Sequence, residues 1–368
     1  MEEDGNQIRE VVVRAPINIA LIKYWGKTNK ELIIPANDSI SITIDELYAE
    51  TTVTLTDSGN DRVVINGDEI DLGKQKRFRV VIKEFRRLIN RQSEGPPFLS
   101  ISSQTNFATS AGLASSAAGF GAIAFGLTKL GKLKESEMIR LARLGSGSAC
   151  RSVLPGFVHW RVVNEGETSC ETLAGSSAWT SLRAVVFELS DRVKDVSSTI
   201  GMQRTLETST LFDYRIRVVV PDRIQRYVRF SVHFIVMLRL KEAIASFDFN
   251  QLAEITMADS NQLHAVCLDS NPPLRYLSDE SWRLIRFVEI FNGNDRKAAY
   301  TFDAGPNCCV FVQTANLPNF LNEFARHFGF TSLPTDLLGL WTPKEDGTLK
   351  LKKLIVSSVG SAPQIVNR

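Results

Sequence analysis

The sequence predicts an α+β protein with two domains. A chain of 368 residues, of which 43% are hydrophobic, can bury a sizeable core, and its length favours two or more domains. Segments with the alternating pattern of strands occur among segments with helical spacing in both halves of the chain. The composition changes near Ser176–Leu182. We therefore expect an N-terminal domain at 1–182 and a C-terminal domain at 183–368.

In the first half, apolar and β-branched residues alternate along several stretches that we interpret as strands. The first, Val11–Lys23, contains a turn at Ala15-Pro16, and Asn66-Gly67 indicates a tight hairpin within Arg62–Ile70. A helix is predicted at Arg77–Arg91, because its apolar residues fall on one face. The other predicted strands of this half are Ser39–Ile44, Ala49–Leu55, Phe98–Ser103 and Phe157–Val163.

The second half mixes the same two patterns. Helical spacing predicts helices at Phe247–Leu268 and Ser278–Phe291. Strands are predicted at Ala184–Leu189, at Ala298–Asp303 and at Cys308–Val312.

The overall composition excludes several classes of protein. Lys and Arg number 43 against 41 Asp and Glu, a net charge of +2, which gives no argument for a nucleic-acid or membrane partner. The five cysteines show no Cys-x-x-Cys spacing, so neither a disulfide framework nor a zinc site is indicated, and a reducing compartment is the simplest interpretation. The acidic, polar N-terminus does not resemble a secretory signal. We expect a cytoplasmic protein.

A glycine-, serine- and alanine-rich stretch at Asn106–Gly121 leads directly into an apolar segment. Small side chains let a ligand approach the backbone, and the free N–H groups of a helix start favour an anion. Ser110, Ser115 and Ser116 add hydroxyls that could bind phosphate or lie beside a magnesium ion. The alternative is a small-residue helix packed on a sheet, with serines as caps. Neither a P-loop nor a Rossmann glycine motif is present.

Three further segments carry candidate anion-binding or catalytic groups. Ser146, Ser148 and Arg151 lie in a second small-residue stretch and could converge on one oxyanion; a glycine bend within a helix is the alternative. Lys23–Lys27 leaves a buried segment with two lysines and a glycine, which suits an anionic ligand or a solvated strand end. Asp303 ends a strand before a Gly-Pro turn, as a rigidly held carboxylate or as a turn cap.

Together, six segments resemble the mevalonate diphosphate decarboxylase family, which shares a superfamily with galactokinase, homoserine kinase, mevalonate kinase and phosphomevalonate kinase. The Gly-Leu-Ala-Ser-Ser motif is shared across the superfamily. Lys-Tyr-Trp-Gly-Lys, Gly-Ser-Gly-Ser-Ala-Cys-Arg and Phe-Asp-Ala-Gly-Pro-Asn are typical of the decarboxylases. The segments are Ala15–Lys27, Gly112–Ala117, Gly145–Arg151, Ser198–Met202, Met257–Pro273 and Tyr300–Asn307.

The resemblance implies the two-domain α+β fold of that superfamily, with a ribosomal protein S5-like N-terminal half, a ferredoxin-like C-terminal half and an active site in the cleft between them. It also implies ATP-dependent decarboxylation of mevalonate 5-diphosphate to isopentenyl diphosphate. The hydroxyl on carbon 3 is first phosphorylated, and phosphate and carbon dioxide then leave. ATP and Mg²⁺ would be required, and relatives are often homodimers.

The resemblance also implies roles for individual residues. Asp303 would face the reacting hydroxyl, as base or as electrostatic support, and Lys23 would hold its charge. Ser146, Gly147, Ser148 and Arg151 would bind the substrate's carboxylate or diphosphate. The other substrate-binding residues would be Tyr24, Trp25, Gly26, Lys27, Arg77, Lys194, Ser198 and Thr199. The ATP phosphates would lie against Asn106, Ser110, Gly112, Leu113, Ala114, Ser115 and Ser116. Mg²⁺ would be held mainly through those phosphates, with Ser116 as the candidate hydroxyl.

The sequence departs from the family pattern at two places. Ala108 stands where the family usually has proline, and Arg226–Leu238 is extra sequence, either a surface loop or a gene-model error. Two other functions remain open: a kinase of the same superfamily that stops at phosphorylation, and a ligand sensor without catalytic activity.

Overall fold

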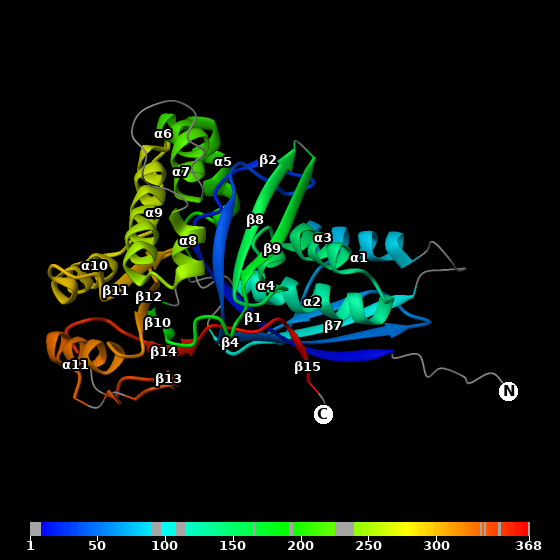
Figure 1. Ribbon diagram of the computed structural model, residues 1–368. Helices are drawn as coiled ribbons and strands as arrows, with labels where there is room; N and C mark the ends of the chain where they lie inside the picture. The colour runs from blue at the N-terminus through cyan, green and yellow to red at the C-terminus, as the bar shows by residue number, and fades with distance from the viewer. Residues whose placement is uncertain are drawn as a thin grey trace.

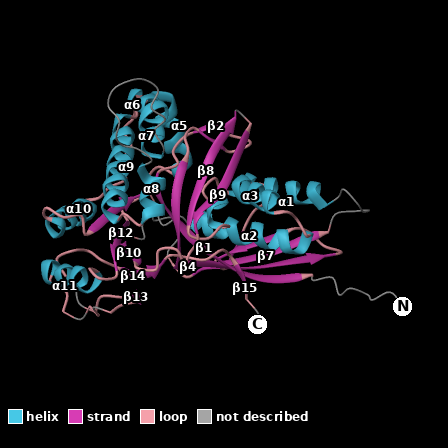
Figure 2. Ribbon diagram, in the orientation of Figure 1, coloured by secondary structure: helices cyan, strands magenta, loops and turns pink. Residues whose placement is uncertain are grey.

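A computed structural model describes residues 9–89, 97–107, 115–164, 166–190, 194–224, 239–331, 333–334, 336–344 and 347–366. These residues form an α+β structure with two separate large sheets, each covered by helices (Figure 1; Figure 2). The predicted fold class is therefore confirmed. The extra segment Arg226–Leu238 lies outside the described residues.

An eight-stranded sheet forms the first half. Its main path runs β15-β1-β4-β7-β5-β6, and β8 joins β4 to β9. Helices α1 (Lys76–Ile89), α2 (Ser115–Gly131) and α3 (Glu135–Gly145) lie together over this sheet in Figure 1, and the short α4 (Ala149–Ser152) follows. Its strands are β1 (Glu10–Ile22), β4 (Ser39–Thr56), β5 (Arg62–Ile65), β6 (Asp68–Glu69), β7 (Phe98–Thr105), β8 (Phe157–Asn164), β9 (Glu167–Ala174) and β15 (Gln364–Ile365).

The prediction of a turn at Ala15-Pro16 is wrong. Residues Glu10–Ile22 form one strand that pairs with β4, and the register shifts between Pro16 and Ile17. A proline has no N–H for the ladder, and a bulge accommodates it without ending the strand. The two predicted strands Ser39–Ile44 and Ala49–Leu55 are likewise parts of the single strand β4, in which residues 45–47 are the extra residues at this register shift.

The second half contains a five-stranded antiparallel sheet in the order β11-β12-β10-β14-β13. Helices α10 (Asp279–Asn292) and α11 (Leu317–Phe328) pack against one face of it around an aromatic-rich core. The long helix α9 (Phe249–Asp269) contacts both β11 and β1 and so reaches across to the first half. The strands are β10 (Leu182–Glu188), β11 (Ala298–Phe302), β12 (Cys308–Gln313), β13 (Gly339–Trp341) and β14 (Lys353–Ser358).

Shorter elements lie around α9. They are the hairpin β2 (Lys27–Asn29) and β3 (Ile34–Pro35), the helices α5 (Ser198–Thr208), α6 (Thr210–Tyr214), α7 (Val220–Ile224) and α8 (Arg239–Ser246), and the π-helical turn Arg215–Val219.

One hydrophobic core joins the two halves. It contains Ile19 and Ile42 from the first sheet together with Val186, Phe311 and Ile355 from the second, all at most 5% exposed. After β14 the chain returns to the first half, where β15 pairs with β1. An extensive apolar interface restricts relative motion of domains. The cleft between the halves is therefore built on a rigid base, and the boundary at 182/183 remains a prediction.

Candidate active site

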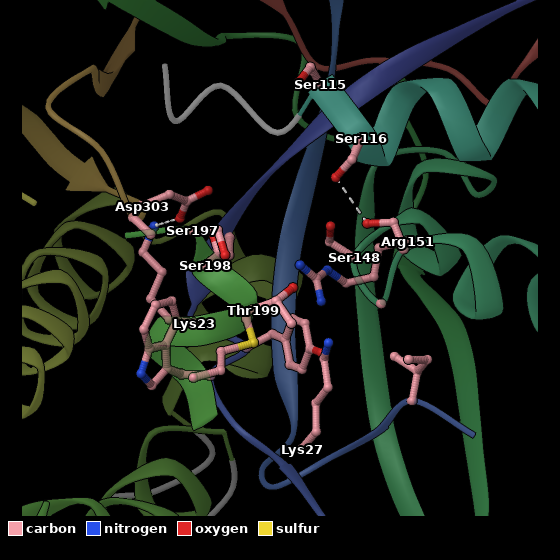
Figure 3. Close-up of a pocket in the computed structure, with 18 of the residues that line it drawn as sticks. Lys23, Lys27, Ser115, Ser116, Ser148, Arg151, Ser197, Ser198, Thr199 and Asp303 are labelled. Carbon is pink, nitrogen blue, oxygen red and sulfur yellow. Dashed lines mark hydrogen bonds and ion pairs between the residues drawn. The ribbon is translucent and has the colours of Figure 1, made fainter. Parts of the chain in front are cut away.

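A cavity of about 310 Å³ lies between the two halves. In Figure 3, Lys23 and Asp303 lie on one side of this space, and Ser116, Ser148 and Arg151 lie on the other. The structure thus brings together segments that are far apart in the sequence. The predicted site residues that line the cavity are Lys23, Tyr24, Trp25, Lys27, Arg77, Ser115, Ser116, Ser146, Gly147, Ser148, Arg151, Lys194, Ser198, Thr199 and Asp303.

Lys23 and Asp303 form an ion pair at one side of the cavity. The ammonium nitrogen Nζ of Lys23 donates to Oδ1 of Asp303 at 2.6 Å, with the lysine 2% and the aspartate side chain 31% exposed. Asp303 directly follows the fully buried strand β11, whose last N–H, that of Phe302, donates to Oγ of Ser260 on α9. The Gly305 N–H donates to the Asp303 carbonyl in the turn. The carboxylate is therefore fixed at its base and open to the cavity on one side.

The main chain of Lys23 is held by a buried charged cluster that we did not predict. Its N–H donates to Oδ2 of Asp259 at 2.8 Å, and its carbonyl accepts from Arg215 at 3.3 Å and from Asn37 at 3.0 Å. Arg215 also binds both carboxylate oxygens of Asp259, at 3.0 and 2.9 Å, and Arg223 binds Oδ1 at 2.6 Å. Asp259 and Arg215 are 0% exposed.

The charge of Asp259 is maintained by these neighbours. Burial raises the pKa of its carboxyl, but Arg215, Arg223 and the Lys23 N–H outweigh this effect, so the pKa lies below the usual value. The sequence holds one signal for the cluster: Asp259 falls on the same face of the predicted helix as Ile255 and Leu263, and a charge on a buried face needs a partner.

Arg151 forms the opposite wall of the cavity with neutral partners. Its guanidinium donates to Oγ of Ser39 at 2.7 Å, to Oγ of Ser41 at 3.0 Å and to Oδ1 of Asn18 at 3.3 Å, and it is 2% exposed. Within the described parts of the chain, no carboxylate forms an ion pair with it. Burial lowers the pKa of the Arg151 guanidinium. A buried, oriented cation without a counterion is suited to bind an anion.

A third group of cations surrounds the start of α5. Lys194 donates to Oγ of Ser198 and to the Ala304 carbonyl, both at 2.8 Å, and Arg77 from α1 donates to Oγ1 of Thr199 at 2.8 Å. Burial lowers the pKa of Lys194, although Asp303 acts in the opposite direction. Burial, followed by repulsion from Arg77 and Lys30, lowers the pKa of Lys27 to about 8. With the N–H groups of the α5 start, these side chains can hold a multiply charged anion.

The start of α2 contributes hydroxyls. Ser115 and Ser116 begin this helix, and Oγ of Ser116 lies 3.1 Å from Oγ of Ser146 in the loop after α3. The two predicted anion-binding stretches therefore meet. Four predicted residues of the first stretch, Ser110, Gly112, Leu113 and Ala114, lie outside the described residues.

The aromatic residues after Lys23 shape the wall. Tyr24 packs edge-on against Trp160 with ring centroids 4.8 Å apart, and its buried hydroxyl has no hydrogen-bond partner within the described residues. Gly147 is required beside it, since a Cβ there would lie 2.7 Å from that hydroxyl. Trp25 donates from Nε1 to Oγ1 of Thr205 at 3.1 Å.

Among the predicted site residues that the structure describes, two do not line the cavity. Gly26 has φ +82°, and a Cβ there would lie 2.7 Å from the Phe212 ring, so it allows a tight turn. The Asn106 side chain donates to the Glu46 carbonyl at 2.8 Å and accepts from the Tyr48 N–H at 2.9 Å, which ties it to β4. These contacts are structural, and ligand binding by either residue remains a prediction.

The fold and this cleft define a class: a two-domain α+β protein with the fold of the small-molecule kinase superfamily. Two family models match, the diphosphomevalonate decarboxylase-like N-terminal domain over residues 15–171 and the mevalonate 5-diphosphate decarboxylase C-terminal domain over residues 184–366. The chain belongs to the diphosphomevalonate decarboxylase family.

Individual relatives resemble the chain over nearly its full length. The diphosphomevalonate decarboxylase of Candida albicans is 40% identical, with 96% of each chain covered. The solved mevalonate diphosphate decarboxylase of Trypanosoma brucei is 33% identical, with a TM-score of 0.82 and 98% of each chain covered. A structure of MDDEF in complex with MVAPP, AMPPCP and magnesium is 31% identical, with a TM-score of 0.79, and covers 98% of this chain and 99% of that one.

Proposed function

We propose that this chain catalyses the ATP-dependent decarboxylation of mevalonate 5-diphosphate. The products are isopentenyl diphosphate, carbon dioxide, ADP and phosphate. The observation that carries the proposal is the arrangement of the cleft, in which the Lys23–Asp303 ion pair faces a cavity with separate cationic walls at Arg151 and at the start of α5. A substrate with a carboxylate at one end and a diphosphate at the other requires such a pair of anion sites around one reacting hydroxyl.

Each of the substrate's two anionic groups is assigned to one cationic side of the cavity. We assign the single carboxylate to Arg151 with Ser146 and Ser148, because the buried guanidinium supplies one oriented charge. We assign the diphosphate to Lys27, Arg77 and Lys194 with the start of α5, because several cations there can offset its larger charge. Ser198 and Thr199 contribute hydroxyls, and Tyr24 and Trp25 limit the width of the cavity.

The nucleotide phosphates fit the start of α2. Ser115 and Ser116 supply hydroxyls there, and the N–H groups of the first helical turn favour anionic oxygens. Among the described residues, no group of three or more His, Cys, Asp or Glu side chains could hold a metal ion. We therefore propose that Mg²⁺ is held by the ATP phosphates and Ser116, where it neutralises phosphate charge when bound.

Asp303 then receives the substrate's tertiary hydroxyl. As a carboxylate held by Lys23, Asp303 accepts a hydrogen bond from this hydroxyl. The hydrogen bond orients the hydroxyl oxygen toward the phosphate to be transferred. The hydroxyl oxygen bonds to the transferred phosphorus as the bond to ADP breaks, and the hydroxyl proton passes by way of Asp303 to solvent. The hydroxyl has then become a phosphate leaving group, and Asp303 is again a carboxylate. When the C–O bond breaks, positive charge develops on carbon 3, and the carboxylate of Asp303 stabilises that charge. Loss of carbon dioxide supplies the electron pair of the new double bond.

The decisive experiment uses mevalonate 5-diphosphate labelled at carbon 1 together with Mg²⁺ and ATP. We expect one labelled carbon dioxide and one inorganic phosphate for each ADP formed. ADP formation without labelled carbon dioxide would identify a kinase, and absence of both would identify a non-catalytic binding protein.

We also propose a cytoplasmic location and a homodimer. The five cysteines are all unpaired, which suits a reducing compartment, and none of the described helices is long and apolar enough to cross a membrane. The dimer rests on analogy with relatives. Light scattering with size-exclusion chromatography tests the dimer, and imaging of the tagged protein in its source cells tests the location.

A further inference from the structure

A groove of about 530 Å³ adjoins the cavity, lined by the β2–β3 hairpin and helices α1, α3 and α5. Lys27 and Thr199, labelled in Figure 3, line both the cavity and the groove, so the two spaces lie side by side. The junction coincides with the cations that we assign to the substrate's diphosphate. A diphosphate bound there would therefore have the cavity on one side and the groove on the other.

The floor of the groove is apolar. Leu144 and Met202 are 6% and 8% exposed, whereas Leu206 is 39% exposed. Ligand pockets of this size are typically lined by apolar side chains, and covering these side chains with a hydrocarbon removes apolar surface from water, which is favourable. The apolar lining residues are Leu32, Ile33, Val80, Leu144, Met202 and Leu206.

The rim of the groove is strongly basic. Seven basic and two acidic side chains line it, a net charge of +5, whereas the whole chain carries +2. Glu84 is already bound by Arg87 at 2.8 Å and by Arg140 at 2.7 Å. Lys30, Lys76 and Lys83 form no ion pair within the part of the chain that the structure describes. The rim therefore attracts anions while the floor attracts hydrocarbon.

We propose that this groove binds the hydrocarbon tail of an anionic amphiphile, a diphosphate monoester longer than the reaction product, whose head occupies the Lys27 and Arg77 site. Since the head site is the assigned diphosphate site, the inference rests on the proposed function. Such a molecule competes with the substrate, because both need the same cations. The length of its tail, rather than its head group, then sets how tightly it binds.

The test is inhibition by a series of straight-chain alkyl diphosphates from ethyl to decyl, below their micelle concentrations, with inorganic diphosphate as the head-group reference. We expect inhibition competitive with the substrate. The inhibition constant should fall about threefold to fourfold per added methylene until the groove is filled. Calorimetric titration of the same compounds, without turnover, should give the same trend in Kd. An inhibition constant independent of chain length would overturn the proposal.

A matched pair of variants locates the tail. Leu206→Gln places an amide in the groove, and Leu268→Gln makes the same change on an exposed α9 position away from it, where the leucine is 54% exposed. Both should keep normal kcat and KM. Leu206→Gln should weaken the octyl compound about tenfold and leave inorganic diphosphate unchanged, whereas Leu268→Gln should change neither. Equal effects of both variants would place the tail elsewhere.

A protein that releases no labelled carbon dioxide, yet binds longer alkyl diphosphates more tightly, would refute the proposed decarboxylation and support the groove as a hydrocarbon site.

Discussion

Asp303 and Lys23 are separated by 280 positions in the sequence, and their side chains meet at 2.6 Å. The lysine is buried, so the aspartate is its counterion as well as the group that we propose faces the substrate. Removing the carboxylate charge therefore has two effects, one on the reaction and one on the lysine that remains buried. An amide substitution separates them better than alanine, because it keeps the shape and an acceptor oxygen.

We expect Asp303→Asn to lower kcat by at least about a thousandfold, because the amide cannot carry the charge that stabilises the reacting carbon. The fold should survive, as judged by circular dichroism and by nucleotide binding close to wild type. Labelled carbon dioxide measures turnover, and Glu323→Gln on the exposed surface of α11 is the control. Near-normal turnover in Asp303→Asn would remove this residue from its assigned role.

A substitution at Arg151 tests whether this side of the cavity binds the substrate's carboxylate. Its planar guanidinium reaches two serines and Asn18 at once, and a lysine ammonium cannot reproduce that fork. We expect Arg151→Lys to raise the KM for mevalonate 5-diphosphate by about ten- to a hundredfold while the KM for ATP changes little. Initial rates at varied substrate and fixed ATP give both constants. An unchanged KM for the substrate would place its carboxylate elsewhere.

Lys27 predicts a pH dependence of substrate binding. Its pKa in the free protein is lowered to about 8, and a bound diphosphate raises it again, so binding takes up a proton in the interval above pH 8. The KM for the substrate should therefore rise with pH through this interval and stay flat below pH 7. In Lys27→Arg the cation keeps its charge, and the rise should disappear. A rise that persists in this variant would come from another group.

At the scale of elements, the sequence predicted most of the helices and strands, but not where neighbouring strand segments join into one long strand. Local sequence pattern identified the α1 helix by its periodicity and the hairpin by its Asn66-Gly67 dipeptide, both confirmed. It could not show that β1 continues through Pro16, because the neighbouring strand decides whether a proline bends or ends a strand. The site residues came mostly from motifs. Asp259 could be suspected from its place on the apolar face of a helix, but its partners Arg215 and Arg223 lie on other elements and have no local signature.

The Asp259 cluster links α9 and the π-helical turn to the end of β1. In Asp259→Asn the amide can still accept the Lys23 N–H, but Arg215 and Arg223 lose their buried counterion. We expect Lys23 to move, kcat to fall about ten- to a hundredfold, and the KM for ATP to stay constant. Asp61→Asn is a matched control, because Asp61 likewise binds an arginine, Arg86, through both oxygens and accepts a backbone N–H.

A double-variant cycle shows whether Asp259 acts through Lys23. In a Lys23→Met background, Asp259→Asn should lower kcat no further, since the group that it positions is absent. Independent, multiplicative effects on kcat would show that the cluster only stabilises the fold. A loss in Asp61→Asn as large as that in Asp259→Asn would lead to the same conclusion.

At the scale of the whole molecule, the active site lies where two sheets share one hydrophobic core. Residues of β1 and β4 pack with residues of β10, β12 and β14, and β15 returns to the first sheet. Catalysis by positioning needs walls that keep their separation, because both anionic ends of the substrate must be held around one carboxylate. The shared core supplies that rigidity, although the two halves match separate family models.

The shared core predicts that the halves unfold together. Leu127 lies in the core of the first half and Leu321 in that of the second, and both are 0% exposed. Substituting either by alanine should lower the free energy of unfolding by about 2–5 kcal/mol. In both variants calorimetry should show a single transition, displaced to lower temperature, whose calorimetric and van't Hoff enthalpies agree. Two separate transitions, each displaced by only one of the variants, would show that the halves fold independently. In that case the spacing of the cleft walls would depend on bound substrate.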